Sequence, residues 1–303
     1  MEDAASRIAV TKLVPPAAPS TLVRRDRHVA ALDRLVDDHP VTLVAAPAGA
    51  GKTVLLAEWV HHRPAGSWAW LSCDVTDADS ARFWTSVIAA CTHLGDGVGD
   101  EARALLAEDP VAFDDVVLSL VNDLARLDRS GVLVIDDLLL VLSPAVAPLG
   151  LLVERLPPGV ALVLGSRSDP PLPLHRWRVN GLLGELRADD LRFSTGETAQ
   201  VVAANGVDLT PDDANALTER TEGWAAGVQL AALTLRDHPA PSAFVQEFAG
   251  SDHNVTDYLA GEVLAQLDAE TLDCMLALAT LDEFDAERCR ALTGRHDAAD
   301  RLE

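Results

Sequence analysis

This chain of 303 residues has very little lysine, since only Lys12 and Lys52 stand among its 24 lysines and arginines. It also lacks any stretch of about 18 uncharged apolar residues, so we expect no membrane-spanning helix and no membrane partner. Residues 1–10 have no long apolar core, which excludes a secretory signal in this segment. These absences favour a cytoplasmic protein.

Cysteine is sparse and basic surface is scarce. Cys73, Cys91, Cys274 and Cys289 are far apart, with no Cys-x-x-Cys pair and no zinc-ligand spacing, so we expect reduced, partly buried thiols. The formal net charge of −23 opposes direct binding to nucleic-acid phosphates, which requires a basic face. There is no internal repeat and no G-x-S-x-G nucleophile motif.

A phosphate-binding loop is the strongest motif that is present. The apolar run 41–45 predicts a buried strand, and a helix is expected after the loop. Gly49 and Gly51 allow the backbone to turn its N–H groups inward. Lys52 supplies a charge for the β- and γ-phosphates, and Thr53 supplies a hydroxyl for Mg²⁺. The predicted nucleotide-binding residues are Ala46, Pro47, Ala48, Gly49, Ala50, Gly51, Lys52, Thr53 and Val54.

The loop departs from the usual G-x-x-x-x-G-K-[ST] pattern at one position, because Ala46 replaces the first glycine. The alternative interpretation is a glycine-rich turn with a surface lysine. A chain that nearly avoids lysine but has one at position 52 favours the phosphate-binding interpretation.

Asp136 and Asp137 could form the second half of the site. They directly follow the apolar run 132–135. Parallel strands end at one edge of a sheet, so Asp136 should lie near the loop and hold the metal ion. Asp137 could orient an attacking water. Strand ends often carry polar residues, but the pairing with Lys52, 84 residues earlier, strengthens the metal-site interpretation.

Arg167 follows the next apolar strand, 160–166, and could sense a γ-phosphate from within the same chain. The alternative is a surface arginine paired with one of the 47 carboxylates. The same two interpretations apply to Arg176 and Arg178, on the short segment that follows.

Strands and helices alternate through the first part of the chain, which predicts an α/β fold with a parallel sheet covered by helices on both faces. We expect strands at 41–46, 67–72, 131–135 and 160–166, and helices at 23–35, 53–62, 80–94, 111–127 and 145–156. After about residue 195 only helices are expected, at 195–205, 210–221, 224–236, 242–248, 254–267 and 269–281. Thr210 and Asp268 are candidate N-caps, and Trp224 is expected to fill the helical core.

The chain resembles the large ATP-binding regulators of the LuxR type, a group of signal-transduction P-loop ATPases that includes the bacterial maltose-regulon activator. The resemblance covers nearly the whole chain. It rests on the segments 11–16, 22–25, 46–53, 70–74, 134–137, 166–174, 185–187, 191–193 and 221–227, together with Asp79, Arg82, Phe83 and Trp84.

This resemblance implies a domain order. We expect a leader (1–22), a P-loop NTPase domain (23–194), a helical lid (195–250) and the start of a winged-helix-like domain (251–303). A sensor and a C-terminal DNA-binding helix-turn-helix would lie beyond Glu303, so the chain is expected to be a fragment or a truncated version.

The resemblance also implies a function, an ATP/ADP switch with slow hydrolysis. ATP and an unidentified inducer would promote homo-oligomerisation, and DNA and RNA polymerase would be partners only of a full-length protein. By analogy Arg24 or Arg25 would lie near the base and ribose, and Arg167 and Arg178 near the phosphates.

Two residues depart from the family pattern, namely Leu139, where histidine is usual, and Asn180, where arginine is common. The alternative functions are a stand-alone ATPase or phosphotransferase and a signalling scaffold ATPase without DNA binding.

Overall fold

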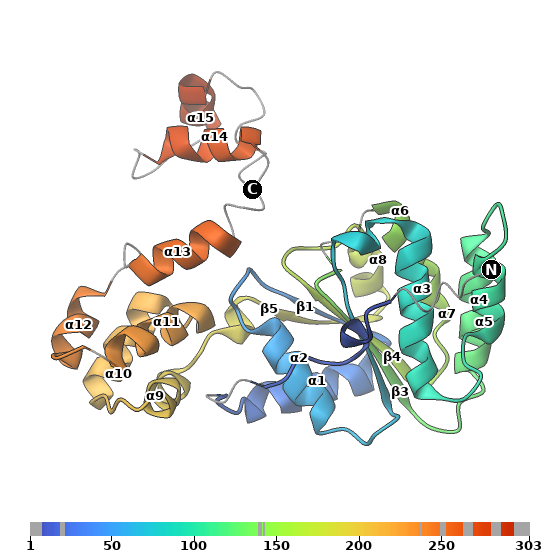
Figure 1. The fold of residues 1–303 in the computed structure, drawn as a ribbon, viewed down its shortest axis with the longest axis horizontal. Coiled ribbons are helices and arrows are strands. Elements are labelled where there is room, and N and C mark those ends of the chain that lie inside the picture. Colours follow the sequence, from blue (N-terminus) through green and yellow to red (C-terminus); the bar gives the residue numbers. More distant parts are fainter. Residues whose placement is uncertain are drawn as a thin grey trace. The chain divides into compact units, whose positions relative to one another are not determined.

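A parallel sheet of five strands organises the first of the two compact units into which the chain divides, Met1–Gln246 and Glu247–Glu303 (Figure 1). The computed structural model describes residues 8–18, 22–138, 141, 143–236, 238–248, 253–262, 269–279 and 286–293. Leu139 and Asp268, both singled out in the sequence, lie outside these residues.

The strand order places the loop strand near the centre of the sheet. The order is β2-β3-β4-β1-β5, with every neighbouring pair parallel. Strands β1, β3 and β4 are buried along their whole length, as continuous apolar runs require. The bounds are Val41–Ala45 (β1), Trp68–Ser72 (β2), Gly131–Asp136 (β3), Val160–Ser166 (β4) and Leu183–Arg187 (β5).

Helices cover both faces of this sheet, as predicted. Apolar side chains of α1 (Asp26–Asp38) and α2 (Lys52–His61) pack on one face. On the other face, a larger core is formed with α3 (Ser80–Cys91), α4 (Asp100–Leu106), α5 (Phe113–Leu124), α6 (Ser143–Val146), α7 (Leu149–Arg155) and α8 (Leu174–Val179).

Some elements differ from the prediction. Strand β5 was not expected, because its Leu-Gly-Glu-Leu-Arg sequence mixes apolar and polar residues without a clear strand pattern. The strand lies at the edge of the sheet and is only partly buried. The helix predicted at 145–156 is two helices, α6 and α7, and Pro148 stands as the N-cap of α7. Helix α4 was also missed, and α8 occupies the short segment that carries Arg176 and Arg178.

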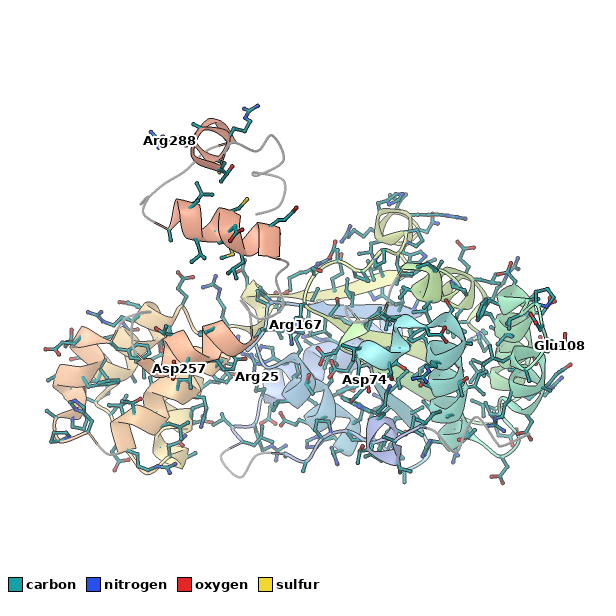
Figure 2. All side chains as sticks on the ribbon, turned by 45° about the horizontal axis from the view of Figure 1, so that its top comes forward. Arg25, Asp74, Glu108, Arg167, Asp257 and Arg288 are labelled. Carbon is teal, nitrogen blue, oxygen red and sulfur yellow. The ribbon has the colours of Figure 1, made fainter. Side chains whose placement is uncertain are left out.

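The N-terminal leader is not wholly irregular. Residues Val10–Leu13 form a 3-10 turn, η2, that contacts β2. Lys12 from this turn forms ion pairs with Asp74, at 3.2 Å, and with Asp77, whose side chain is 1 % exposed. Asp77 also accepts a hydrogen bond from Ser86. The ion pairs of Lys12 therefore fix the turn to the segment after β2. Asp74 is labelled in Figure 2.

A helical layer of α9 (Thr195–Ala204), α10 (Pro211–Thr221), α11 (Ala225–Arg236) and α12 (Pro241–Glu247) follows the sheet. Ser194 and Glu197 form a capping box at the start of α9. Thr210 caps α10 by accepting a hydrogen bond from the N–H of Asp213, as predicted, and Pro211 occupies the first helical turn. Among the described residues after 195 there are helices but no strands.

The second unit is described through three helices, α13 (His253–Glu262), α14 (Ala269–Leu278) and α15 (Ala286–Thr293). Cys274, Leu278 and Cys289 form a small buried cluster between α14 and α15. All four cysteines of the chain are buried and form no disulfide. No helix in the described part of the chain is long and apolar enough to cross a bilayer.

The ion pair of Lys12 predicts a measurable coupling energy. Lys12→Met should lower the free energy of unfolding by about 2–4 kcal/mol, because the carboxylate of Asp77 would stay buried without its cation. In the double variant Lys12→Met/Asp77→Asn the loss should be smaller than the sum of the two single losses, by about 1 kcal/mol or more. Urea unfolding of the four proteins measures this coupling, and additive losses would contradict it.

Candidate functional site

The loop between β1 and α2 has the backbone of a phosphate-binding loop. Gly49 and Gly51 have φ values of +74° and +84°, in the left-handed region that side chains disfavour. Ala46 does not have a positive φ. Its side chain is buried in the apolar cluster that includes residues of α2. The missing first glycine is therefore compatible with this loop, because position 46 needs no left-handed backbone.

Lys52 opens α2, one residue earlier than predicted, and its side chain turns back over the loop. Its Nζ donates to the carbonyl oxygens of Ala46 and Pro47 at 2.6 and 3.1 Å. Burial lowers the pKa of Lys52, while the charges of Asp137 and Asp136 oppose this shift. The ammonium is thus enclosed by the loop and lies within electrostatic reach of both aspartates.

Asp136, at the end of β3, is buried with 1 % of its surface exposed. The hydroxyl of Thr53 lies near this carboxylate and acts to lower its pKa, but the Oδ1 atom has no hydrogen-bond partner. Burial raises the pKa of Asp136 to about 6. An unpaired buried carboxylate oxygen beside a threonine hydroxyl fits a hard cation such as Mg²⁺.

Strand β4 lies between the two halves of the site, and a glycine makes room there. Ile135 of β3 pairs with Leu164 of β4, and Val44 of β1 pairs with Gly165. A Cβ built on Gly165 would lie 2.3 Å from Oδ1 of Asp136. Any side chain at position 165 would therefore displace the carboxylate from its position.

Asp137 has a left-handed backbone, with φ of +55°. A left-handed conformation at a non-glycine residue is uncommon and costs energy, and such residues concentrate at functional sites. Its charge acts on Lys52 across the site. Asp137 therefore lies with Asp136 and Lys52 at the same edge of the sheet.

The predicted arginines fall into two groups. Arg167 follows β4, where Figure 2 marks it, and its charge also acts on Lys52. Arg178, on α8, instead pairs with Glu185 at 2.7 Å and with Asp169 at 3.5 Å. Arg187 of β5 pairs with the same two carboxylates. These pairs raise the pKa of Arg178, with Glu185 as the main cause. The structure brings Arg167 into the electrostatic environment of Lys52, while Arg178 belongs to this separate ion-pair network.

The structure separates Arg24 from Arg25. The side chain of Arg24 is 66 % exposed and pairs with Asp26. Arg25, marked in Figure 2, is 3 % exposed, and a Cβ built on Gly51 would lie 3.5 Å from its Nη1 atom. Nη1 and Nε of Arg25 have no hydrogen-bond partner. Of the two, Arg25 is the one beside the phosphate-binding loop.

Arg25 and His28 also anchor α1 to the segment between β5 and α9. Arg25 donates to the carbonyl oxygen of Leu191 and lies over the ring of Phe193 at 4.8 Å. The Nε2 atom of His28 lies 2.7 Å from the carbonyl oxygen of Asp190. Burial and the charge of Arg25 lower the pKa of His28 to about 4. His28 is therefore neutral in the folded chain near pH 7.

Sequence reasoning missed the contact of the helical layer with the loop. Trp224 was expected to fill the helical core, and this expectation is wrong. The indole N–H of Trp224 donates to the carbonyl oxygen of Ala48 at 3.0 Å, and the N–H of Ala226 donates to that of Gly49 at 2.9 Å. The only sequence signal was the unusual Gly-Trp pair at 223–224.

His28 predicts a pH dependence of stability. Its pKa is about 4 in the folded chain and about 6.5 in an unfolded chain, so the unfolded chain binds more protons between these values and stability falls as the pH is lowered from 6.5 to 4. His28→Gln lacks this loss. The cost of the substitution should therefore be about 2 kcal/mol smaller at pH 5 than at pH 7.5.

Urea unfolding at the two pH values measures this difference. His175→Gln, at an exposed position of α8, is the matched control, and its cost should stay within about 0.5 kcal/mol at both pH values. An equal cost of His28→Gln at pH 5 and pH 7.5 would contradict the prediction.

Comparison with solved structures supports the fold. The chain is similar to a Walker-type ATPase of Pyrococcus abyssi, with a TM-score of 0.58, 12% identity, and 94% of this chain and 92% of that one covered. It is also similar to a signal transduction ATPase with numerous domains and a tetratricopeptide repeat sensor from Pyrococcus horikoshii, with a TM-score of 0.52 and 16% identity, over 93% of this chain and 38% of that one. At these identities the likeness supports the P-loop ATPase fold alone.

Sequence comparison gives the relationship. Residues 21–164 match the AAA ATPase domain, and residues 260–303 match the MalT winged helix domain. The HTH-type transcriptional regulator MalT of Yersinia enterocolitica is 31% identical over 97% of this chain, and that of Vibrio parahaemolyticus is 29% identical over 88%. The chain spans about a third of the length of these relatives. The chain is therefore similar over nearly its whole length to HTH-type transcriptional regulators MalT, and it contains segments that match an AAA ATPase domain and the MalT winged helix domain.

Proposed function

We propose that the chain is the ATP- and ADP-binding switch module of a transcriptional regulator. The observation that carries this proposal is the convergence of Lys52, Thr53 and the unpaired carboxylate of Asp136 at one edge of the sheet. Loop N–H groups of residues 48–54 would surround the phosphates, and Lys52 would provide the charge that fixes them.

Magnesium would be held by Thr53 and Asp136, with the remaining ligands supplied by phosphates and water. No cluster of three or more His, Cys, Asp or Glu side chains in the described residues could hold a metal on its own. This fits Mg²⁺, which proteins usually hold through one or two carboxylates together with substrate phosphates. When bound, the metal would neutralise the phosphate charge, and Asp136 with Thr53 would fix its place.

Asp137 and Arg167 could support slow hydrolysis of the bound ATP. Asp137, one residue beyond the metal carboxylate, would orient a water for attack, and Arg167 would stabilise charge on the γ-phosphate. Arg25, rather than Arg24, would contact the nucleotide, because two of its buried guanidinium nitrogens have no hydrogen-bond partner and one of them, Nη1, lies beside Gly51. Arg178 would first have to leave its pairs with Glu185 and Asp169.

The regulatory role rests on the relatives, whose name describes transcriptional regulators with a helix-turn-helix. In a longer protein, exchange of ADP for ATP with an inducer would control oligomerisation and promoter binding beside RNA polymerase. DNA contact would come from another part of that protein, because this chain has a net charge of −23.

Nucleotide binding is tested with Lys52→Ala. Calorimetry should detect binding of ATP or ADP with Mg²⁺ by the natural chain, and the substitution should weaken it about 10- to 100-fold, as expected for loss of hydrogen bonds from a charged donor. The nucleotide that copurifies with each protein can be extracted and identified.

Arg34→Ala removes an exposed cation from α1 and is the matched control, with unchanged affinity expected. If the folded natural chain takes up no adenine nucleotide, the proposed function is wrong. Rapid steady-state ATP turnover without any partner would favour a stand-alone ATPase instead.

Gly165→Ala tests the metal half of the site. The added methyl group would push the Asp136 carboxylate away from its place, so the stabilisation of ATP binding by Mg²⁺ should fall at least about tenfold. Gly150→Ala, in α7, adds the same methyl group where no atom lies within 4 Å, and should leave binding unchanged. Titrations with Mg²⁺ and with EDTA measure the effect, and equal behaviour of both variants would contradict the assignment of Asp136.

A further inference from the structure

The tip of the phosphate-binding loop contacts a segment 176 positions later in the chain. The side chain of Trp224 and the backbone N–H of Ala226 donate to the carbonyl oxygens of Ala48 and Gly49. We call this pair of hydrogen bonds the loop–helix contact. It joins two consecutive peptide groups of the loop to the start of α11.

The loop–helix contact is closely packed. A Cβ built on Gly49 would lie 2.6 Å from the Cβ of Ala226 and 2.9 Å from the indole ring of Trp224. Glycine is therefore needed at position 49 for two independent reasons, the left-handed backbone and the approach of α11. A substitution there would strain the loop and also push against the helical layer.

The loop–helix contact supplies hydrogen-bond donors to two of the loop carbonyls. A loop that turns its N–H groups toward phosphates must turn its carbonyl groups outward, where they need other donors. Lys52 donates to the carbonyls of Ala46 and Pro47, and Leu55 donates to that of Gly51. Trp224 and Ala226 supply the donors for the two carbonyls at the tip. The helical layer thus stabilises the backbone orientation on which phosphate binding depends.

The donor side of the contact is itself held in place. Gly223, with φ of +67°, accepts a hydrogen bond at its carbonyl from the N–H of Phe193 at 2.8 Å, and its own N–H donates to the carbonyl of Thr218 at 2.9 Å. The N–H of Trp224 donates to Thr221, and its carbonyl accepts from Val228. The backbone of Trp224 is therefore held in place at the start of α11, from where its side chain reaches the loop.

We propose that Trp224 is a positioning residue for the nucleotide site, which holds the phosphate-binding loop in its binding conformation and slows nucleotide release. This proposal rests on the proposed function. Because the loop–helix contact and the bound nucleotide both require the same loop conformation, each stabilises the other. Release of nucleotide is then linked to separation of α11 from the loop.

Trp224→Phe tests this proposal because it keeps an aromatic ring but removes the indole N–H, together with part of the ring that lies against Gly49. Stopped-flow fluorescence with methylanthraniloyl-ADP and Mg²⁺ measures the dissociation rate, which should rise about three- to tenfold, as expected for loss of one hydrogen bond to a partly buried carbonyl. Amide hydrogen exchange in residues 46–52 should become faster in the nucleotide-free protein.

Trp84→Phe is the matched control. Trp84 lies in the core of the sheet domain and donates its indole N–H to the carbonyl oxygen of Ala145 at 3.1 Å, away from the loop. The same chemical change there should lower the melting temperature but leave the dissociation rate within about twofold of the natural chain. Trp224→Phe should melt within about 2 °C of the natural chain.

The outcomes separate this proposal from the proposed function. No binding of the ADP analogue by the natural chain would overturn the nucleotide site itself. Binding by the natural chain with an unchanged dissociation rate in Trp224→Phe would overturn the positioning role alone. Equal acceleration in Trp224→Phe and Trp84→Phe would mean a general loss of stability and would also overturn it.

Discussion

The buried carboxylate of Asp136 is the constraint around which this edge of the sheet is arranged. Because β4 lies between β3 and β1, the carboxylate must pass over β4 to reach Thr53, and Gly165 leaves the space. The cost is a buried oxygen without a partner and a pKa raised to about 6 by burial. A core arranged for stability alone would not contain such a group. The cation proposed to bind this carboxylate would account for its presence.

Much of the sheet and the loop could be predicted because their signals are local. The apolar runs of β1, β3 and β4 are continuous since these strands are buried on both faces. Gly49 and Gly51 mark positions that need a left-handed backbone. The convergence of Asp136 with Lys52 follows from parallel strands ending at one edge. The fold class and the placement of Asp136 and Lys52 at one edge of the sheet were therefore accessible from the sequence.

The features that were missed depend on contacts between distant segments. Strand β5 is recognisable only from its partner β1, because its own sequence does not alternate clearly. Arg24 and Arg25 have the same chemistry, and only the packing of α1 buries one of them beside Gly51. Trp224 looks like a core residue in its own helix until the loop is placed against it. No local pattern contains this information.

The scarcity of lysine also has a structural explanation. Both lysines have oxygens around a compact ammonium group: Lys52 between two loop carbonyls, and Lys12 between Asp74 and Asp77. An ammonium donates in three directions from a single point, whereas a guanidinium donates from a planar fork. Arginine serves the other cationic positions, including the ion-pair network of Arg178 and Arg187. Lysine is therefore kept where the geometry requires a point charge, and that is why its position in the loop was informative.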